Sequence, residues 1–285
     1  MDIKANQRLP LWWFLILASF GYADTNLFHW LASPEIQEFT GIGQYRIFSL
    51  LVYALTTGIA VIVYMVLLKS RGMTMKAAGY RGRLTWKGVM AAIIAVVIVS
   101  FIIYPLIEMG LKAAGVPMYW TTGQIAPVSQ NTLQDMLLGI LVTVILAPLT
   151  EDTIFRGYVY QAFAQRMHRW AAIAGSSLIF ALLHIQFFGP GMAIWILFFG
   201  MASAWLYSRF DNIYPSLLFH ALNNLWAYII LPMIFNNHGL KIRIRFIKLP
   251  QIIRTFGKSY HHLQMKELFD SIAPQIAEIR TVCKS

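Results

Sequence analysis

Long apolar stretches separated by short polar turns run along most of the chain. Windows long enough to cross about 30 Å of hydrocarbon, at about 1.5 Å per helical residue, fall near residues 11–31, 47–68, 88–107, 137–163, 171–188, 191–208 and 213–235. The sequence of these windows shows no internal repeat. The pattern predicts an all-α, polytopic transmembrane bundle of seven to eight spans. We expect one membrane domain over residues 1–235, with its polar motifs in 133–235, and a basic C-terminal tail over 236–285.

The composition agrees with a membrane protein. The 285 residues are 58% hydrophobic and 12% charged, and the mean hydropathy of +0.59 exceeds that of a soluble domain of this length. A net charge of +11 would suggest nucleic acid in a soluble protein. In a membrane protein, basic residues instead collect in cytoplasmic loops and near anionic headgroups, so no nucleic-acid partner is predicted. The single cysteine, Cys283, excludes an internal disulfide framework and disfavours thiol catalysis.

Basic residues also predict the orientation. The segment 69–87 carries six Lys or Arg and no acid, which indicates a cytoplasmic loop and a cytoplasmic N-terminus. The basic turns near Arg166 and Arg209 agree. The tail does not, because seven spans would place its basic residues outside. Two explanations stay open: an eighth, re-entrant piece within 225–235, broken at Pro232, or an interfacial amphipathic tail.

Two further features follow from local composition. Gly and Pro residues within 108–133 predict an irregular extracytoplasmic loop. The Trp12-Trp13 pair, next to the first apolar window, is typical of an anchor at the lipid-water interface.

Three ionisable residues, Glu151, Asp152 and Arg156, directly follow the apolar run 136–149. A charge at the centre of a bilayer costs at least ~2.5–3.5 kcal/mol, so such residues are by default candidates for function. On a helix, Asp152 and Arg156 stand four apart and can pair, whereas Glu151 points about 100° away. Pairing would keep Arg156 buried and leave Glu151 available for chemistry.

Two more pairs at helical i,i+4 spacing follow, Phe180 with His184 and His220 with Asn224. Counted from the basic end of each helix, Glu151, His184 and Asn224 lie about 20–22 Å deep at 1.5 Å per residue. Three antiparallel helices therefore bring these side chains and His220 into one slab of the membrane. A polar, water-filled cavity is the least costly surrounding for them.

One carboxylate, two imidazoles and one carboxamide suit amide hydrolysis. Glu151 can act as the general base toward a water that His184 orients, while His220 and Asn224 donate hydrogen bonds to a developing oxyanion. Alternatively, Glu151, His184 and His220 ligate one divalent metal such as Zn²⁺, which leaves an open position for the water. The residues leave both alternatives open.

At these motifs the chain resembles the CPBP family (CAAX protease and bacteriocin-processing, or Abi) of intramembrane endopeptidases. The family pattern is Glu-Glu-x-x-x-Arg, then Phe-x-x-x-His, then His-x-x-x-Asn, each on its own transmembrane helix. The matching residues here are Glu151, Asp152 and Arg156, then Phe180 and His184, then His220 and Asn224. One departure is visible, because Asp152 stands where the family has a second Glu. Asp is adequate if this acid pairs with the arginine, but not if it must reach the water or a metal.

The resemblance implies a protease or metalloprotease that cleaves a membrane-anchored protein or peptide in the lipid bilayer. It implies catalytic roles for Glu151, His184, His220 and Asn224, with Asp152, Arg156 and Phe180 supporting them. We expect a multi-pass protein of a bacterial inner membrane. The alternative is a non-proteolytic bacteriocin-immunity or scaffold protein of the same fold. A proton-coupled transporter is a weaker hypothesis, since no repeated halves are detectable.

Overall fold

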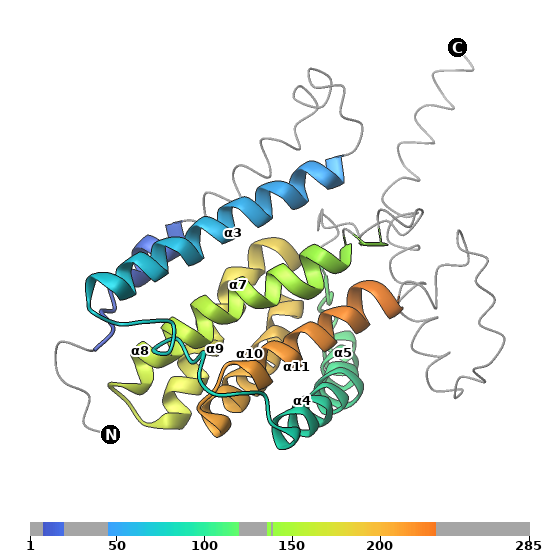
Figure 1. The fold of residues 1–285 in the computed structure, drawn as a ribbon. Coiled ribbons are helices and arrows are strands. Elements are labelled where there is room, and N and C mark those ends of the chain that lie inside the picture. The colour runs from blue at the N-terminus through green and yellow to red at the C-terminus, as the bar shows by residue number, and fades with distance from the viewer. Residues whose placement is uncertain (1–7, 20–44, 120–135, 138, 232–285) are drawn as a thin grey trace, which may run out of the picture.

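The computed structural model describes residues 8–19, 45–119, 136–137 and 139–231, and every regular element within these ranges is helical (Figure 1). The all-α prediction is thus confirmed for the described part of the chain. Several elements join end to end into longer helices that change between α and π geometry. The elements are α3 (Tyr45–Ser70), α4 (Trp86–Ile98), η2 (Val99–Ile103), α5 (Tyr104–Ala113), η3 (Ile140–Leu146), α7 (Ala147–Ile154), η4 (Phe155–Tyr160), α8 (Gln161–Ala164), α9 (Arg169–Phe188), α10 (Pro190–Phe210), α11 (Tyr214–Asn224) and η5 (Leu225–Ile230), the η elements being π-helical.

Two of the described helices, Trp86–Ala113 and Pro190–Phe210, are long and apolar enough to cross a membrane. Gly58–Ser70 and Arg169–Ile185 form shorter apolar helices. These four coincide with predicted windows, whereas most of the first window lies outside the described residues. The count of seven to eight spans therefore stays a prediction, as does the tail over 236–285, which is also outside them.

One boundary prediction is wrong and another is untested. The predicted irregular loop from residue 108 begins too early, because α5 continues to Ala113 before Gly115 turns the chain with a positive φ. Helix η5 continues α11 without a break through Leu225–Ile230. Pro232, the predicted break, lies outside the described residues.

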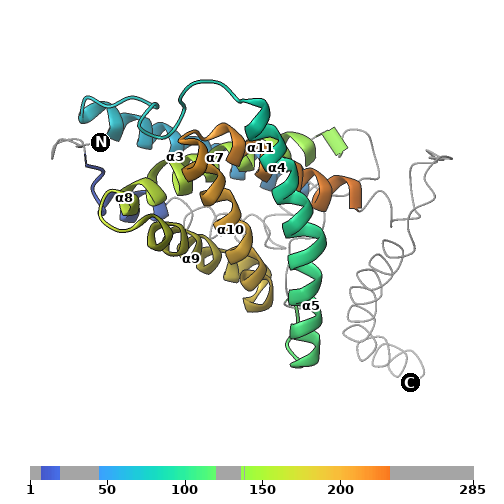
Figure 2. The ribbon, with the colours of Figure 1, turned by 90° about the horizontal axis from the view of Figure 1, so that it is seen from below.

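The helices after α7 pack around one apolar core. Helices α9 and α10 form an antiparallel hairpin whose turn is Gly189, with φ +90°, followed by Pro190 at the start of α10. Helix α10 packs against α11, and α11 packs against α4 (Figures 1 and 2). Aromatic side chains fill the space between them, with Phe199 stacked on Phe219 at 4.9 Å. On the other side, α3 packs against α7.

The N-terminal segment is anchored on the helix that carries the acidic motif. Trp13 is buried against the rings of Tyr64 and Tyr158, which also contact each other. The Tyr158 hydroxyl donates to the carbonyl of Pro10 at 2.7 Å. Of the predicted Trp12-Trp13 anchor, only Trp12 is exposed. The anchor prediction is therefore wrong for Trp13, because its ring completes an aromatic cluster that long-range packing creates.

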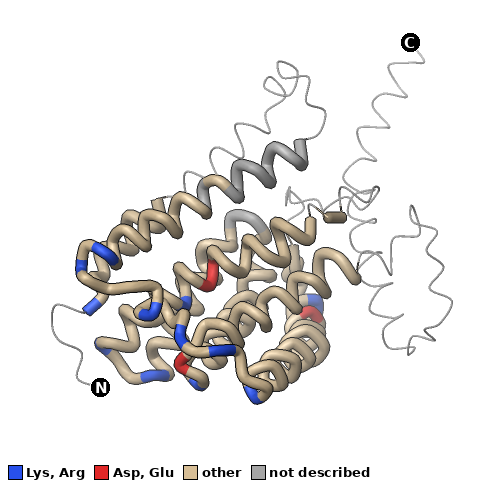
Figure 3. Tube along the Cα trace, viewed as in Figure 1, with Lys and Arg blue, Asp and Glu red and all other residues tan. Residues whose placement is uncertain are grey.

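Basic residues gather at one end of the helices, around the turns between α3 and α4, α8 and α9, and α10 and α11 (Figure 3). The segment between α3 and α4 docks against this end. The amide of Ile213 donates to the carbonyl of Gly79 at 2.9 Å, and Arg81 pairs with Asp211 at 2.5 Å. These contacts fix the segment 71–85 to the turn that precedes α11.

The same segment reaches α7 through Tyr80. Its hydroxyl lies 2.6 Å from Thr153 Oγ, which itself donates to the carbonyl of Leu149, so Tyr80 is the donor. Burial raises the pKa of Tyr80 above its ordinary value, and the hydroxyl therefore stays protonated at neutral pH. The segment thus tethers the helix that presents Glu151 and Asp152.

Gly79 leaves no room for a side chain where the segment 71–85 packs against the helices. Its φ is +92°, and a Cβ there would overlap the ring of Tyr207. We expect Gly79→Ala to lower the free energy of unfolding by about 2–4 kcal/mol, from backbone strain plus overpacking. Gly82 has a similar φ of +62° with open space around it, so Gly82→Ala should cost only the strain, about 1–2 kcal/mol. Thermal unfolding of both variants in detergent measures the difference in stability. Equal losses of stability in the two variants would contradict the overlap with Tyr207.

Candidate active site

Asp152 and Arg156 form a buried ion pair on one face of the helix. The Arg156 Nη1 atom lies 2.8 Å from Asp152 Oδ1, and the two side chains are 2% and 0% exposed. The predicted i,i+4 pairing is confirmed. The guanidinium also lies over the ring of Phe180, 4.5 Å from its centroid. Nevertheless, neither Nη atom of Arg156 makes a well-directed hydrogen bond within the described structure.

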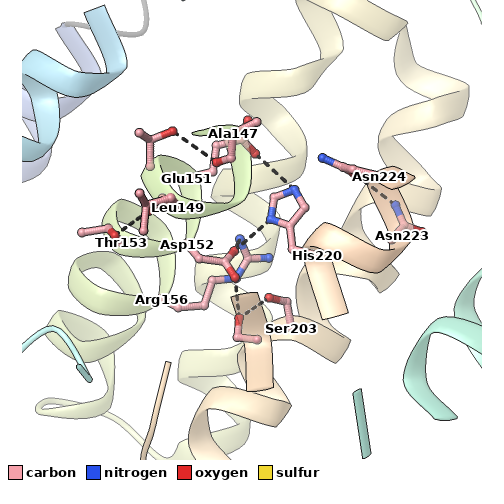
Figure 4. A network of polar contacts seen from close by, with 12 residues as sticks. Ala147, Leu149, Glu151, Asp152, Thr153, Arg156, Ser203, His220, Asn223 and Asn224 are labelled. Atoms are coloured by element: carbon pink, nitrogen blue, oxygen red, sulfur yellow. Dashed lines mark hydrogen bonds and ion pairs between the residues drawn. The ribbon is translucent and has the colours of Figure 1, made fainter. Parts of the chain in front are cut away.

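The well-directed hydrogen bonds of Asp152 go to helix α11 instead. Oδ1 lies 3.1 Å from His220 Nδ1 (Figure 4). Oδ2 accepts a 2.7 Å hydrogen bond from Ser216. Because Asp152 is the ion-pair partner of Arg156, its carboxylate is the acceptor and His220 Nδ1–H the donor. This link was missed from the sequence, where Asp152 was assigned to Arg156 alone. The available signal was Ser216, which lies four residues before His220 and hence on the same helix face.

His184 is oriented by its own helix. Its Nδ1–H donates to the carbonyl of Phe180 at 2.7 Å, and the two rings pack with centroids 4.4 Å apart. The two members of this predicted i,i+4 pair thus contact each other. The bond at Nδ1 turns Nε2 toward Glu151, 3.9 Å from Oε2.

Both imidazoles converge on one carboxylate oxygen. Glu151 Oε2 lies 3.8 Å from His220 Nε2 as well as 3.9 Å from His184 Nε2. In each ring Nδ1 holds the proton of a fixed hydrogen bond, so a neutral ring presents a lone pair at Nε2. The structure thus brings together Glu151, His184 and His220 from α7, α9 and α11, as the depth argument predicted.

The two neighbouring acids have opposite environments. Glu151 is 21% exposed and His184 19%, whereas Asp152 is 0% exposed. Successive residues of a helix point about 100° apart, so one acid faces an accessible side and the other the protein interior. Both lie in the short helix α7, between the π-helical elements η3 and η4. Such departures from α geometry are frequent at functional sites.

Asn224 satisfies a carbonyl that this change of geometry exposes. In η3 the amide of Ala147 bonds to Val142 and not to Thr143, and the next residue, Pro148, has no N–H to offer. The carbonyl of Thr143 accepts instead from Asn224 Nδ2 at 2.8 Å. This bond uses one of the two amide hydrogens of Asn224.

Asn223, the neighbour of Asn224, bonds to a different helix. Its Oδ1 accepts from Ser100 in η2 at 3.0 Å. Asn223 thus turns toward η2, and Asn224 turns toward η3. The i+4 residue of the motif, and not its neighbour, is the one that lies against the helix of Glu151.

We expect Asn224→Ala to destabilise the protein, because the Thr143 carbonyl would lose its partner. An unsatisfied buried polar group costs about 1–3 kcal/mol, measurable as the free energy of unfolding in mixed micelles. Glu151→Gln serves as the control, since it alters a candidate catalytic group while keeping its shape. Parental stability in Asn224→Ala would contradict this account of the bond.

Glu151, His184 and His220 are also the candidate ligands of a metal ion. Within the described residues, no group of three or more His, Cys, Asp or Glu side chains is placed so that it could hold a metal ion. The ligand separations around Glu151 exceed the roughly 3.3 Å expected between ligands of one tetrahedral Zn²⁺. The zinc ion on Glu151, His184 and His220 therefore stays a prediction from ligand types, and the mechanism proposed for this site has no step through it.

Comparison with known proteins bears on the same region. Residues 133–226 match the family model described as "Type II CAAX prenyl endopeptidase Rce1-like". The matched range contains all three motifs, so the resemblance to CAAX-type proteases is confirmed. Neither the curated proteins nor the solved structures yielded a match. Together with its apolar helices, the match indicates a membrane protein related to proteases.

Proposed function

We propose, from the family match of residues 133–226 and the geometry around Glu151, that this chain is an intramembrane endopeptidase of the CAAX-protease type. It hydrolyses a peptide bond of a membrane-anchored protein or peptide. Its seven to eight spans enclose a polar cavity in the bilayer of a bacterial inner membrane, with the N-terminus cytoplasmic. The observation that carries the proposal is the convergence of two imidazole Nε2 atoms on one carboxylate oxygen.

The acceptor geometry has room for a hydrogen donor between these groups. The carboxylate of Glu151 and the two Nε2 lone pairs are all acceptors, and separations of 3.8 and 3.9 Å leave room for one water hydrogen-bonded to two of them. Glu151 takes a proton from this water as its oxygen attacks the carbonyl carbon of the scissile peptide. The same proton then passes to the leaving amine, so that the carboxylate is restored.

The oxyanion of the tetrahedral intermediate needs donors on its other side. His220 donates at Nε2 when its ring has taken up a second proton from solvent, which it keeps through the step and returns on product release, and the Asp152 carboxylate at Nδ1 faces that positive charge. Asn224 lies one helical turn further along α11 and contributes an amide N–H. In this role Asp152 needs to reach His220 but not the water. The shorter side chain that stands in place of the family's Glu is therefore adequate.

The test is cleavage of a library of membrane-anchored peptides by detergent-purified protein, with and without a zinc chelator. We expect cleavage within the membrane-proximal part of the peptides. Unchanged cleavage with the chelator supports water activation by Glu151, whereas loss that added Zn²⁺ reverses supports the metal alternative. A folded protein that cleaves no peptide would overturn the protease proposal in favour of the immunity or scaffold alternative.

A further inference from the structure

Two buried serines form a hydrogen-bonded series that ends at Asp152. Ser216 of α11 and Ser203 of α10 are both fully buried, with their Oγ atoms 2.6 Å apart. Ser216 donates to Asp152 Oδ2 at 2.7 Å, so a chain of contacts runs from α10 through α11 to α7 (Figure 4). Neither serine belongs to the three motifs that predict the site.

Most other Ser and Thr hydroxyls with a hydrogen bond in the described helices donate to their own backbone, although Ser100 donates to Asn223. A Ser or Thr within a helix commonly donates to the carbonyl three or four residues earlier. Seven hydroxyls of the described residues do so, namely those of Ser19, Ser70, Thr143, Thr150, Thr153, Ser176 and Ser177. Ser216 instead donates to a carboxylate on another helix. Its hydroxyl is therefore directed to the site and not to its own backbone.

The hydrogens of this chain can be placed one by one. Ser216 has a single hydroxyl hydrogen, which Asp152 accepts, so Ser203 must donate to Ser216. Asp152 then accepts from Ser216 at Oδ2 and from His220 Nδ1–H at Oδ1. Donors aligned in one direction strengthen each other. This series of hydrogen bonds, from Ser203 through Ser216 to Asp152, keeps the proton of His220 on Nδ1. Nε2 of His220 is left facing Glu151.

The geometry points to Ser216 as a positioning residue: its hydroxyl holds the Asp152 carboxylate in the orientation that keeps the His220 proton on Nδ1. Arg156 does not do this, because its Nη atoms make no well-directed hydrogen bond in the described structure. Without Ser216, Asp152 Oδ2 loses its donor and the carboxylate is free to rotate toward the guanidinium. Nδ1 of His220 would then lose its acceptor. The consequence for catalysis rests on the proposed function, but the effect on the imidazole does not.

The test reads the imidazole directly. Histidine-selective ¹⁵N NMR of the detergent-purified protein distinguishes Nδ1–H from Nε2–H tautomers, and a His220→Gln spectrum assigns the His220 signals. We expect the parent to show the Nδ1–H pattern and Ser216→Ala to shift both nitrogen signals toward the Nε2–H pattern. Ser176→Ala is the matched control, because it removes a buried hydroxyl that bonds only its own helix. Unchanged His220 signals in a folded Ser216→Ala protein would overturn the inference.

Kinetics give a second readout if the parent cleaves peptide. Ser216→Ala should lower kcat about tenfold at unchanged KM, as expected for one lost hydrogen bond to a charged group. In an Asp152→Asn background the same change should have no further effect on kcat. An equal loss of kcat in both backgrounds would show that Ser216 does not act through Asp152. Absence of cleavage by the parent would count against the protease proposal alone, since the NMR measurement decides the role of Ser216 independently.

Discussion

Glu151→Gln should lower kcat for peptide cleavage by about 10²–10⁴-fold, the usual contribution of a positioned general base. The amide keeps the shape of the side chain but cannot accept the proton of the attacking water. Because binding of the peptide does not depend on this proton, KM should change little. Initial cleavage rates over a range of peptide concentrations measure both constants.

The matched control is Glu108→Gln, the same substitution on the helix Trp86–Ala113. Glu108 is only partly buried, and it lies outside the three motifs. We expect parental rates from this variant. If Glu151→Gln cleaves as fast as Glu108→Gln, the assignment of Glu151 as the base is wrong.

Arg156→Ala should give the largest loss of stability. It would leave the carboxylate of Asp152 buried and without its counter-charge, and breaking a buried pair in this way costs about 3–5 kcal/mol. The cation-π contact with Phe180 would be lost as well. The free energy of unfolding from a titration with a denaturing detergent in mixed micelles measures the effect.

The chain offers an exposed pair of the same residue types for comparison. Arg81 and Asp211 lie 2.5 Å apart, but their side chains are 34% and 70% exposed. Solvent screens such a pair, so Arg81→Ala should cost about 0–1 kcal/mol. In addition, Asp152→Asn combined with Arg156→Ala should recover part of the loss, because no buried charge then remains. Similar losses from Arg81→Ala and Arg156→Ala would contradict the role of burial.

The sequence was sufficient for the parts of the site that depend on helical periodicity. Asp152 and Arg156 pair because residues four apart share a helix face. Glu151, His184 and His220 meet because equal depths on antiparallel helices place side chains at one level. Apolar windows likewise predicted helices where α4, α9 and α10 are found, because a segment that buries apolar side chains on all sides has few alternatives in lipid.

The sequence was not sufficient to predict which side chains on different helices form hydrogen bonds with each other. Ser216 and Ser203 carry no motif, and their contact depends on how α10 and α11 are rotated about their axes. The hydrogen bond from Asn224 to Thr143 depends on π geometry in η3, which the sequence marks only by Pro148. Trp13 was assigned to the interface because composition indicates exposure at a helix end but not the aromatic neighbours that bury it.

The unequal exposure of the two neighbouring acids has a practical consequence for chemical labelling. A hydrophobic carbodiimide enters membrane protein interiors and, at acidic pH, forms an adduct with a carboxyl group that it can reach. Of the two acids, Glu151 is accessible, whereas Asp152 is enclosed beside Arg156. One label on the peptide that contains both residues would therefore mark Glu151. A cleavage-resistant peptide ligand that covers this site should protect it, which offers a way to identify ligands before any substrate is known.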